Sequence, residues 1–576
     1  MSEYYRIALV AHVACEQGNA MWPVYEQLKL AGHAVELLDP KVDPRLLDAQ
    51  GQPDLGYLAK FIEVFQPHCI AHEGRSVAEI LAAARQSALA PDAQRARHVI
   101  VFGYLGQDNF GDELIFGQIC RKVRDRYPGA WVTAVSFACG SCLEHHGTVC
   151  IPYPQKAQLA ASLNGADVLL FMAGILADLS FEKYGCGLAD FTLNPGIEIG
   201  GQAAACLLAY VSGVPALALG IGAGPLSNPD AQALVRMAAL TGVRYVGRDQ
   251  HTCDLLAAAG VPAAQLCCKA DLAFTVGADQ LAQLPAELAG AAPYAVVSLR
   301  ERDDLPGQHV CPPDFTRAIA AGLDRLWASH GIRPVLVDLD PADVTIHREV
   351  VSLMQHGGEA IHLHACELDQ TLAVLAGAGM VVAMRLHASI VANSFGVPSI
   401  GFSYEDKVSS FYQQMGRQDC LLPMGVGVQE FERFVDEFAA DLPGRAQALQ
   451  APVEQNRRLA QEAFDLLWQV MDARHAQPTP QHVYSRSVSP DQLELGAFVD
   501  VLKHDLADAR AERDAACGQL DGVRAELNAA RDELARTRDD AQRAHQEIAD
   551  IRASHSWRLG NAFMRPLAAL KRMLGR

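Results

Sequence analysis

The feature that most constrains the fold is a strand–helix–strand pattern within residues 380–407. An apolar run at 380–384 predicts a buried strand of a parallel sheet, because strands covered on both faces are apolar along their length. Apolar residues then recur at helical spacing until Gly396 and Pro398 end the helix. A second apolar run at 399–403 predicts the next strand. Two strands joined by one helix favour an α/β fold built on parallel sheets.

Charged side chains stand just past the ends of these two strands. Arg385 and His387 follow the first strand, where the helix begins, and Lys407 follows the second strand after Glu405. Ligands of open α/β sheets bind outside the carboxyl ends of strands, and the exposed N–H groups of a helix N-terminus favour an anion there. We therefore expect a titratable, anion-binding site in which Arg385 and Lys407 supply positive charge and Glu405 is a further binding residue.

Strand and helix signals alternate through most of a chain of 576 residues, which is long for a single domain. The pattern restarts twice, so it predicts three successive α/β units. They are an N-terminal extension at 1–95, a first Rossmann-like half at 96–285, and a second Rossmann-like half with a closing helix at 286–474. The extension lacks a glycine-rich phosphate-binding fingerprint, and its residues are interpreted as scaffold.

A linker and a repeating tail are expected after these units. Residues 475–490 have the Pro and Ser content of a linker. Within 491–553, apolar residues recur every seven positions from Leu520 to Ile548, which predicts a coiled coil and hence a homo-oligomer. The segment 554–576 combines basic and apolar side chains. It is suited to an anionic membrane surface or a partner's groove, with a plain helix terminus as the alternative.

The composition excludes some classes of function. A formal net charge of −19 argues against general electrostatic binding of nucleic acid. The 15 cysteines are scattered, and the N-terminal residues lack the pattern of a signal peptide. No apolar run approaches the ~20 residues that span a bilayer. We therefore expect a reduced, cytoplasmic protein, with peripheral contact at the inner face of the membrane as an option for the C-terminal tail.

Loops of the first half carry further candidate binding residues. In the sequence GYLGQDNFGDE, Asn109, Gly111 and Asp112 could present an amide and backbone N–H groups to a polar ligand. The alternative is a tight turn in which Asp112 caps the following helix. Gly222, the central glycine of GIGAGPL, indicates close approach of the backbone to a ligand or to a neighbouring element.

Two more arginines follow strands. Arg248 lies between a strand and a helix, so it could bind an anion or pair with Asp249 or Asp271. Arg300 directly follows a strand at 295–299 in the second half, and we expect it to face the same ligand edge.

The cysteine and histidine clusters do not predict a metal site. Cys139, Cys142, His145 and His146 lack both a second ligand pair and the spacing of a zinc site, and an ordinary loop explains them as well. His362 is interpreted as a strand residue. We therefore expect no metal in the protein.

Five sequence pieces, taken together and in order, resemble the polysaccharide pyruvyl transferase family. They are GYLGQDNFGDE, GIGAGPL, VGRDQHTCDLLAAAGV, VVSLR and MRLHASIVANSFGVPSIGFSYEDK. The resemblance covers residues 98–425, a little over half of the chain. It implies two Rossmann-like domains facing across a cleft, as in GT-B glycosyltransferases. One departure lies after the strand at 167–172, where Ala173-Gly174-Ile175 stands in place of a run of glycines.

The resemblance also implies a reaction. Enzymes of this family move the enolpyruvyl group of phosphoenolpyruvate onto a sugar acceptor of a bacterial polysaccharide, usually leaving a pyruvate ketal, and they need no bound cofactor. It implies that Arg385, His387 and Lys407 handle phosphoenolpyruvate. The carboxylate and phosphate of this donor need at least two cations, which Arg385, Lys407 and either Arg248 or Arg300 could supply. We expect His387 to be the general acid/base, with capping of its own helix as the alternative.

Two other functions stay open at the level of the sequence. The same fold and cations could serve a GT-B glycosyltransferase that uses a nucleotide sugar. Alternatively, an inactive core could act as a scaffold of polysaccharide assembly through its coiled coil. A comparison of phosphoenolpyruvate with nucleotide sugars as donor substrates would distinguish the first alternative. Activity of a core truncated after residue 490 would exclude the second.

Overall fold

The chain divides into two units, residues 1–483 and 484–576, and the computed structural model describes residues of the first. The described residues are 4–10, 21–31, 33–38, 46, 53–72, 74–89, 92, 95–106, 108–136, 139–152, 156–163, 165–172, 175–176, 198–288, 293–300, 312, 314–357, 360–363 and 367–477. The expected coiled coil, the basic tail and most of the linker lie outside the described residues, so these expectations stay predictions.

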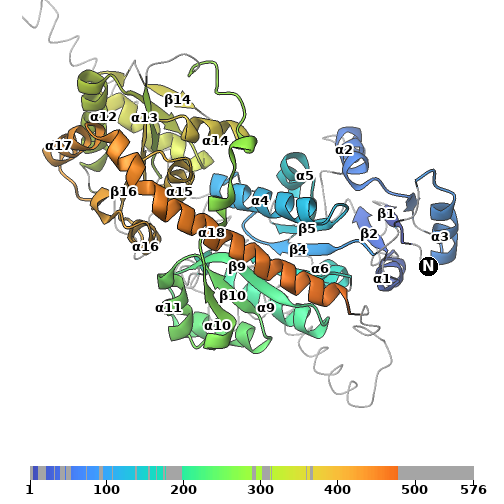
Figure 1. Cartoon of the computed structure of the whole chain (residues 1–576). Helices are drawn as coiled ribbons and strands as arrows, with labels where there is room; N and C mark the ends of the chain where they lie inside the picture. The colour runs from blue at the N-terminus through green and yellow to red at the C-terminus, as the bar shows by residue number, and fades with distance from the viewer. Residues whose placement is uncertain are drawn as a thin grey trace, which may run out of the picture. The chain divides into compact units, whose positions relative to one another are not determined.

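Three sheets organise the described part of the chain, with helices between most consecutive strands (Figure 1). The strand pairs within these sheets are parallel. Parallel neighbours require crossover connections, which the helices supply. The expected α/β fold with parallel sheets is therefore confirmed.

The first sheet belongs to the N-terminal extension and has the order β2–β1–β3. Its elements are β1 (Arg6–Val10), α1 (Trp22–Leu30), β2 (Ala34–Leu38), α2 (Leu55–Phe65), β3 (Cys69–His72) and α3 (Val77–Arg85). Two side-chain hydrogen bonds join this unit to the next one. The hydroxyls of Tyr25 and Ser162 are 2.8 Å apart, and the indole N–H of Trp131 donates to Glu36 at 2.6 Å.

The second sheet has the order β11–β10–β9–β7–β4–β5–β6, with β8 beside β9. Its elements are β4 (His98–Phe102), α4 (Phe110–Arg126), β5 (Trp131–Ser136), α5 (Cys139–His146), β6 (Val149–Pro152), α6 (Lys156–Leu163), β7 (Val168–Met172), β8 (Ile175–Leu176), α9 (Glu198–Val211), β9 (Ala216–Ala223), α10 (Pro229–Leu240), β10 (Arg244–Gly247), α11 (Gln250–Ala258), η2 (Ala263–Gln265), β11 (Leu266–Cys268), η3 (Leu272–Thr275) and η4 (Ala278–Gln280).

The third sheet has the order β14–β13–β12–β15–β16–β17. Its elements are β12 (Tyr294–Ser298), α12 (Phe315–His330), β13 (Arg333–Val337), η5 (Pro341–Asp343), α13 (Val344–Leu353), β14 (Ile361–Leu363), α14 (Leu368–Ala376), β15 (Met380–Ala383), α15 (Leu386–Ser394), β16 (Ser399–Phe402), α16 (Asp406–Gln414), η7 (Gln418–Cys420), β17 (Leu421–Leu422) and α17 (Val428–Ala439).

Both large sheets reverse their strand order once. The second sheet reverses between β4 and β7, and the third reverses between β12 and β15. Ligands of such sheets bind outside the carboxyl ends of the strands at the reversal, because the loops there diverge to opposite faces. The residues that follow β4, β12 and β15 are therefore the ones placed to form a site.

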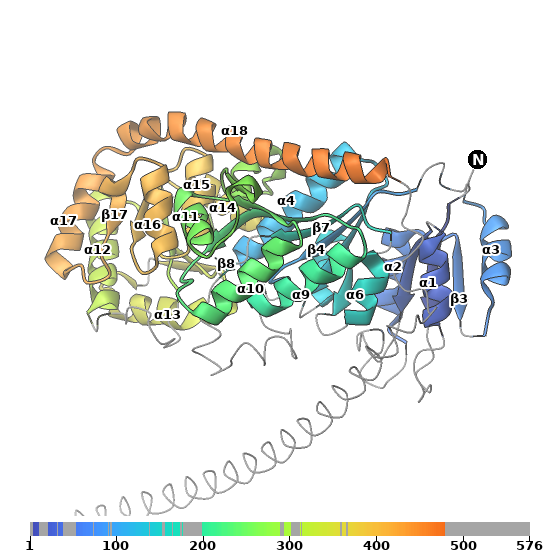
Figure 2. The same cartoon turned by 90° about the horizontal axis from the view of Figure 1, so that it is seen from below.

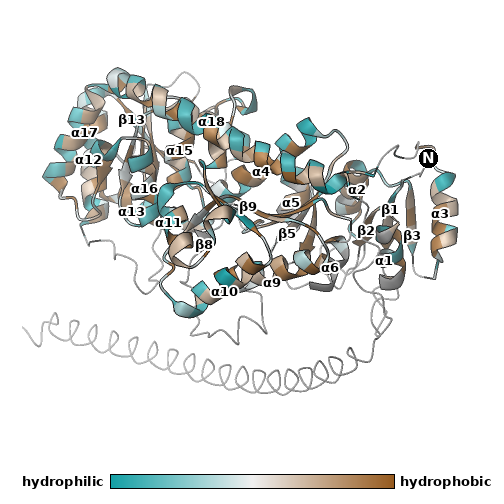
Figure 3. Ribbon diagram, turned by 60° about the horizontal axis from the view of Figure 1, so that its bottom comes forward, coloured by the Kyte–Doolittle hydropathy of each residue, from teal (hydrophilic) through white to brown (hydrophobic). Residues whose placement is uncertain are grey.

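A single long helix, α18 (Leu442–His475), packs against both large sheets (Figures 1 and 2). Its first half contributes Leu449 and Val453 to the core of the third sheet, and its second half contributes Phe464 and Leu467 to the core of the second. Hydrophilic and hydrophobic residues alternate along α18, as expected for a helix that lies on the surface (Figure 3). This helix holds the two halves together.

The described cysteines differ in one place from the expectation of a fully reduced chain. Cys150 is disulfide-bonded, whereas the free thiols of the described part include Cys120, Cys253 and Cys268. Among the described residues, no helix combines the length and apolar character needed to cross a membrane.

Candidate active site

The loop after β4 ends in a helix N-terminus that reaches the other half. Asn109, not Asp112, caps α4: its side-chain oxygen accepts from the N–H groups of Gly111 at 3.1 Å and Asp112 at 3.3 Å. The expectation that Asp112 caps the helix is wrong, because Asn109 has the extended backbone of an N-cap and the helix already begins at Phe110. The side chain of Asp112 is thereby left for another role.

The same loop is bonded to the end of β13. The Asn109 amide donates to Asp340 at 3.2 Å, and the Phe110 N–H donates to the Leu339 carbonyl at 2.9 Å. These bonds bring the carboxyl edge of the second sheet to the carboxyl edge of the third. A site at this junction draws residues from both halves.

His387 lies at the centre of the junction. It stands in the first turn of α15, for which Arg385 is the N-cap residue, so the alternative that His387 caps its own helix is wrong. Its ring packs against Gly111, where a Cβ would lie 1.9 Å from Nδ1. Its Nε2 is 3.6 Å from a carboxylate oxygen of Asp271, and among the described residues it has no hydrogen-bond partner. The imidazole thus carries a nitrogen suited to proton exchange.

Asp271 is a site residue that the sequence suggested only as a partner of Arg248. It is buried, its Oδ1 accepts from the Ala273 N–H at 3.0 Å, and its Oδ2 lies 3.4 Å from Arg248. Burial alone would raise the pKa of Asp271, but the facing His387 and Arg248 outweigh it and hold this pKa below its usual value. Asp271 therefore stays ionised and places a negative charge beside the ring of His387.

Arg248 is almost fully buried beside this carboxylate. Its guanidinium lies against Gly222, where an added Cβ would be 2.7 Å from Nη2. Of the two readings of Gly222, close approach to a neighbouring element therefore describes it. Arg248 also lies 3.7 Å from Asp249, so both carboxylates that the sequence suggested as partners are near it. Its position behind Asp271 makes it part of the support of His387.

Within the cluster, the pKa of Asp112 is strongly shifted from its usual value. Burial raises the pKa of Asp112 to about 6, even though the positive charges of His387, Lys407 and Arg248 oppose the rise. A carboxyl group that titrates near neutrality can give or take a proton under cellular conditions. The cluster therefore holds one such carboxyl group, Asp112, close to the imidazole of His387.

A second cluster gathers two cations around Glu405. Lys407 Nζ lies 2.5 Å from one carboxylate oxygen of Glu405, and Arg300 donates to the other at 2.9 Å. Burial would raise the pKa of Glu405, but Lys407 and Arg300 outweigh burial and lower it. Both cations also lie over the ring of Tyr404, at 5.5 and 5.7 Å from its centroid. Two positive charges share one carboxylate here, so a net positive charge is left to meet an anion.

Arg385 is placed differently from the other expected cations. It makes a bidentate pair with the fully buried Asp343, with Nη2 to Oδ1 at 2.6 Å and Nε to Oδ2 at 3.0 Å. Its Nη2 also lies 3.3 Å from Asp340, the residue that binds Asn109. Binding of a substrate anion by Arg385 would require these bonds to be shared or broken, so its observed role is to hold the start of α15.

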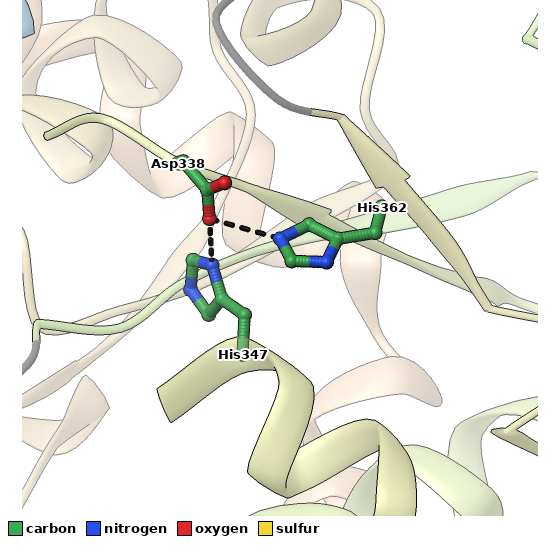
Figure 4. Close-up of side chains that lie close together, drawn as sticks. All are labelled: Asp338, His347 and His362. Atoms are coloured by element: carbon green, nitrogen blue, oxygen red, sulfur yellow. Dashed lines mark hydrogen bonds and ion pairs between the residues drawn. The ribbon is translucent and has the colours of Figure 1, made fainter. Parts of the chain in front are cut away.

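A cluster near the end of β13 has the composition of a metal site; it consists of Asp338, His347 and His362 (Figure 4). However, the Leu299 N–H donates to Nε2 of His347 at 2.9 Å, so the proton of this imidazole sits on Nδ1 and is given to Asp338 at 2.5 Å. Asp338 also accepts from His362 at 2.9 Å. If a metal bound Nδ1 of His347, the ring proton would sit on Nε2 and would face the N–H of Leu299, donor against donor. These bonds therefore favour a hydrogen-bond relay that fixes the backbone just before Arg300.

Comparison with known families bears on the same region. A family model described as "Polysaccharide pyruvyl transferase" matches residues 109–406, just over half of the chain. The matched span begins at Asn109 and ends one residue before Lys407. A search of curated protein sequences found no match.

Solved structures with low similarity were also found. HepE from Anabaena, in complex with UDP and glucose, is 14% identical at a TM-score of 0.43, over 66% of this chain and 100% of that chain. UDP-GlcNAc 2-epimerase from Neisseria meningitidis, bound to UDP-GlcNAc, is 10% identical at a TM-score of 0.45, over 65% and 100%. Similarities at this level identify neither a ligand nor a reaction for the present chain.

Proposed function

Because the chain belongs to the polysaccharide pyruvyl transferase family, we propose that it transfers pyruvate from phosphoenolpyruvate to a sugar of a bacterial surface polysaccharide or its precursor. The observation that carries the proposal is the cluster of His387 and Asp112 at the junction of the two halves, with Lys407 acting on it electrostatically. It combines an imidazole and a carboxyl group whose pKa is raised to about 6 with a source of positive charge.

The charges of the site suit phosphoenolpyruvate as the donor substrate. Phosphoenolpyruvate carries a phosphate and a carboxylate, and the cationic cluster of Arg300 and Lys407 would attract such an anion. Arg248 contributes at longer range, since Asp271 already neutralises much of its charge. Glu405 would hold these two partly buried cations in place while they bind phosphoenolpyruvate.

The proton steps can be assigned to the titratable pair. Protonation of the donor's methylene carbon leaves an oxocarbenium-like carbon that one acceptor hydroxyl attacks. A second hydroxyl of the same sugar then displaces phosphate, so two C–O bonds form, one C–O bond breaks, and the two hydroxyl protons end on the new methyl group and on the phosphate. His387, which faces the carboxylate of Asp271, would donate the first proton, and Asp112 would recover protons from the hydroxyls.

The test is product analysis with a labelled donor. The full-length protein is incubated with ¹³C-phosphoenolpyruvate and acceptor glycans, and mass spectrometry detects the mass of a ketal together with release of phosphate. His387→Ala should abolish turnover without unfolding the protein. His330→Ala removes a histidine that pairs with Asp436 on α17, so it serves as the matched control.

Two results would sink the proposal. One is a His387→Ala protein with activity near that of the wild type. The other is an enzyme that transfers only from nucleotide sugars, which would make it a glycosyltransferase.

A further inference from the structure

A cavity lies along α4, between the two halves. Its volume is about 800 Å³, and residues of α4, α5, η4 and α14 line it. In Figure 1, α5 and α14 flank α4. Cavities of roughly 300–1,000 Å³ are typical of small-molecule sites. None of the residues assigned to proton transfer or to cation binding lines this cavity, so the proposed chemistry does not account for it.

One residue that lines this cavity has an unused hydrogen-bond acceptor. Gln118 is 2% exposed, lines the cavity, and has a side-chain oxygen with no hydrogen-bond partner among the described residues. A buried amide oxygen without a partner costs about 1–3 kcal/mol. A ligand that donates a hydrogen bond to Gln118 would recover this cost.

The basic residues of the cavity are already engaged. Arg121 binds Asp279, and Arg124 donates to the carbonyls of His146 and Gly147, each at 2.8 Å. Arg121 is therefore paired with a carboxylate, and the guanidinium of Arg124 is held by backbone carbonyls rather than left free to turn toward an anion.

The acidic residues of the cavity favour a ligand with several donors and no negative charge. Glu367 and Asp369, at the start of α14, add carboxylates to the wall. His145 lies 3.9 Å from Glu367 across the opening between the halves. Sugar hydroxyls match such a set of acceptors, since each hydroxyl can donate one hydrogen bond.

We propose that this cavity is a sugar-binding subsite, which holds a residue of the acceptor glycan next to the sugar that is modified. Glu113 lines the cavity, and Gly111, two residues earlier, packs against the ring of His387. Both residues belong to the first turn of α4, so a glycan of two or more residues that is bound in the cavity would extend toward His387. The identification of the bound sugar as part of the acceptor rests on the proposed function, whereas the binding of a sugar in this cavity does not depend on it.

The test measures sugar binding directly, without phosphoenolpyruvate. Saturation-transfer NMR on the full-length protein uses four neutral disaccharides: lactose, cellobiose, maltose and N,N′-diacetylchitobiose. At least one should bind, and Gln118→Leu should weaken its binding tenfold or more. Gln265→Leu is the matched control, because Gln265 also has a buried amide oxygen without a partner but lines no part of this cavity.

A second variant guards against a misfolded Gln118→Leu protein. Glu367 is largely exposed at the opening, so Glu367→Ala leaves the core intact and should weaken binding about threefold. The subsite is overturned if none of the four disaccharides binds, or if both variants bind as the wild type does. A protein that binds a disaccharide through Gln118 but forms no ketal would refute the proposed function alone. A protein that forms the ketal, and whose sugar binding is unchanged in both variants, would refute the subsite alone.

Discussion

The contact between Gly111 and His387 allows the site to be disturbed by one methyl group. In Gly111→Ala, the new Cβ would lie 1.9 Å from Nδ1 of His387 and 2.5 Å from Cε1. Ordinary contact begins near 3.4 Å, so the ring must move by about 1.5 Å. The backbone of Gly111 is helical, and alanine is favoured over glycine in helices by up to ~1 kcal/mol. The variant should therefore fold, with its histidine displaced.

The expected loss of activity follows from that displacement. A misplacement of about 1 Å at a reacting group can reduce the rate ~100-fold. We therefore expect Gly111→Ala to lower kcat at least ~100-fold, equivalent to ~2.7 kcal/mol in the barrier, while its unfolding midpoint in urea changes little.

The measurement is kcat for ketal formation, together with the NMR shifts of the His387 ring. Gly425→Ala is the control, because its added Cβ would meet nothing within 4 Å. If Gly111→Ala kept a wild-type kcat, the reasoning that ties catalysis to the position of this ring would be refuted.

Three further predictions concern charges. Folding raises the pKa of Asp112 from 3.8 to about 6, so its stabilising effect is complete below pH 3.8 and is lost as the pH rises through 6. In urea unfolding, the free energy of unfolding of Asp112→Asn should therefore exceed that of the wild type by about 2–3 kcal/mol at pH 8 and by little at pH 4. Arg300→Ala and Lys407→Ala should each raise KM for phosphoenolpyruvate tenfold or more, because a charged hydrogen bond contributes about 1.5–3 kcal/mol; an unchanged KM would exclude them as anchors. Arg385→Leu should destabilise the fold by about 3–5 kcal/mol, since Asp343 would stay buried without a counter-ion; a loss below ~1 kcal/mol in urea unfolding would contradict this.

The edge of the sheet that bears the site could be predicted from the sequence. The apolar run before Arg385 identified a strand, and the residues after a strand must lie at its carboxyl end. The same reasoning placed Arg300 and Lys407 at this edge, and the structure joins both to Glu405. Local pattern is sufficient for such placements, because strand direction and alternation are fixed by a few neighbouring residues.

The partners of those residues could not be predicted. Asp271 follows the short edge strand β11, where nothing in the local pattern distinguishes it from other carboxylates. Its place beside His387 depends on how two halves pack, over a separation of more than a hundred residues. The buried pair of Arg385 and Asp343 is of the same kind, as is the raised pKa of Asp112, whose largest cause is burial.

The two charged residues of the sequence Arg-Leu-His at 385–387 can now be given different roles. Arg385 is bonded to Asp343 and Asp340, and Asp340 also binds Asn109, which caps α4. One network therefore fixes the first turns of α15 and α4, the two helices that carry His387 and Asp112. Because both proton-exchanging groups sit on turns held by these bonds, Arg385 would act on the reaction by positioning them, and the anion would be left to Arg300 and Lys407.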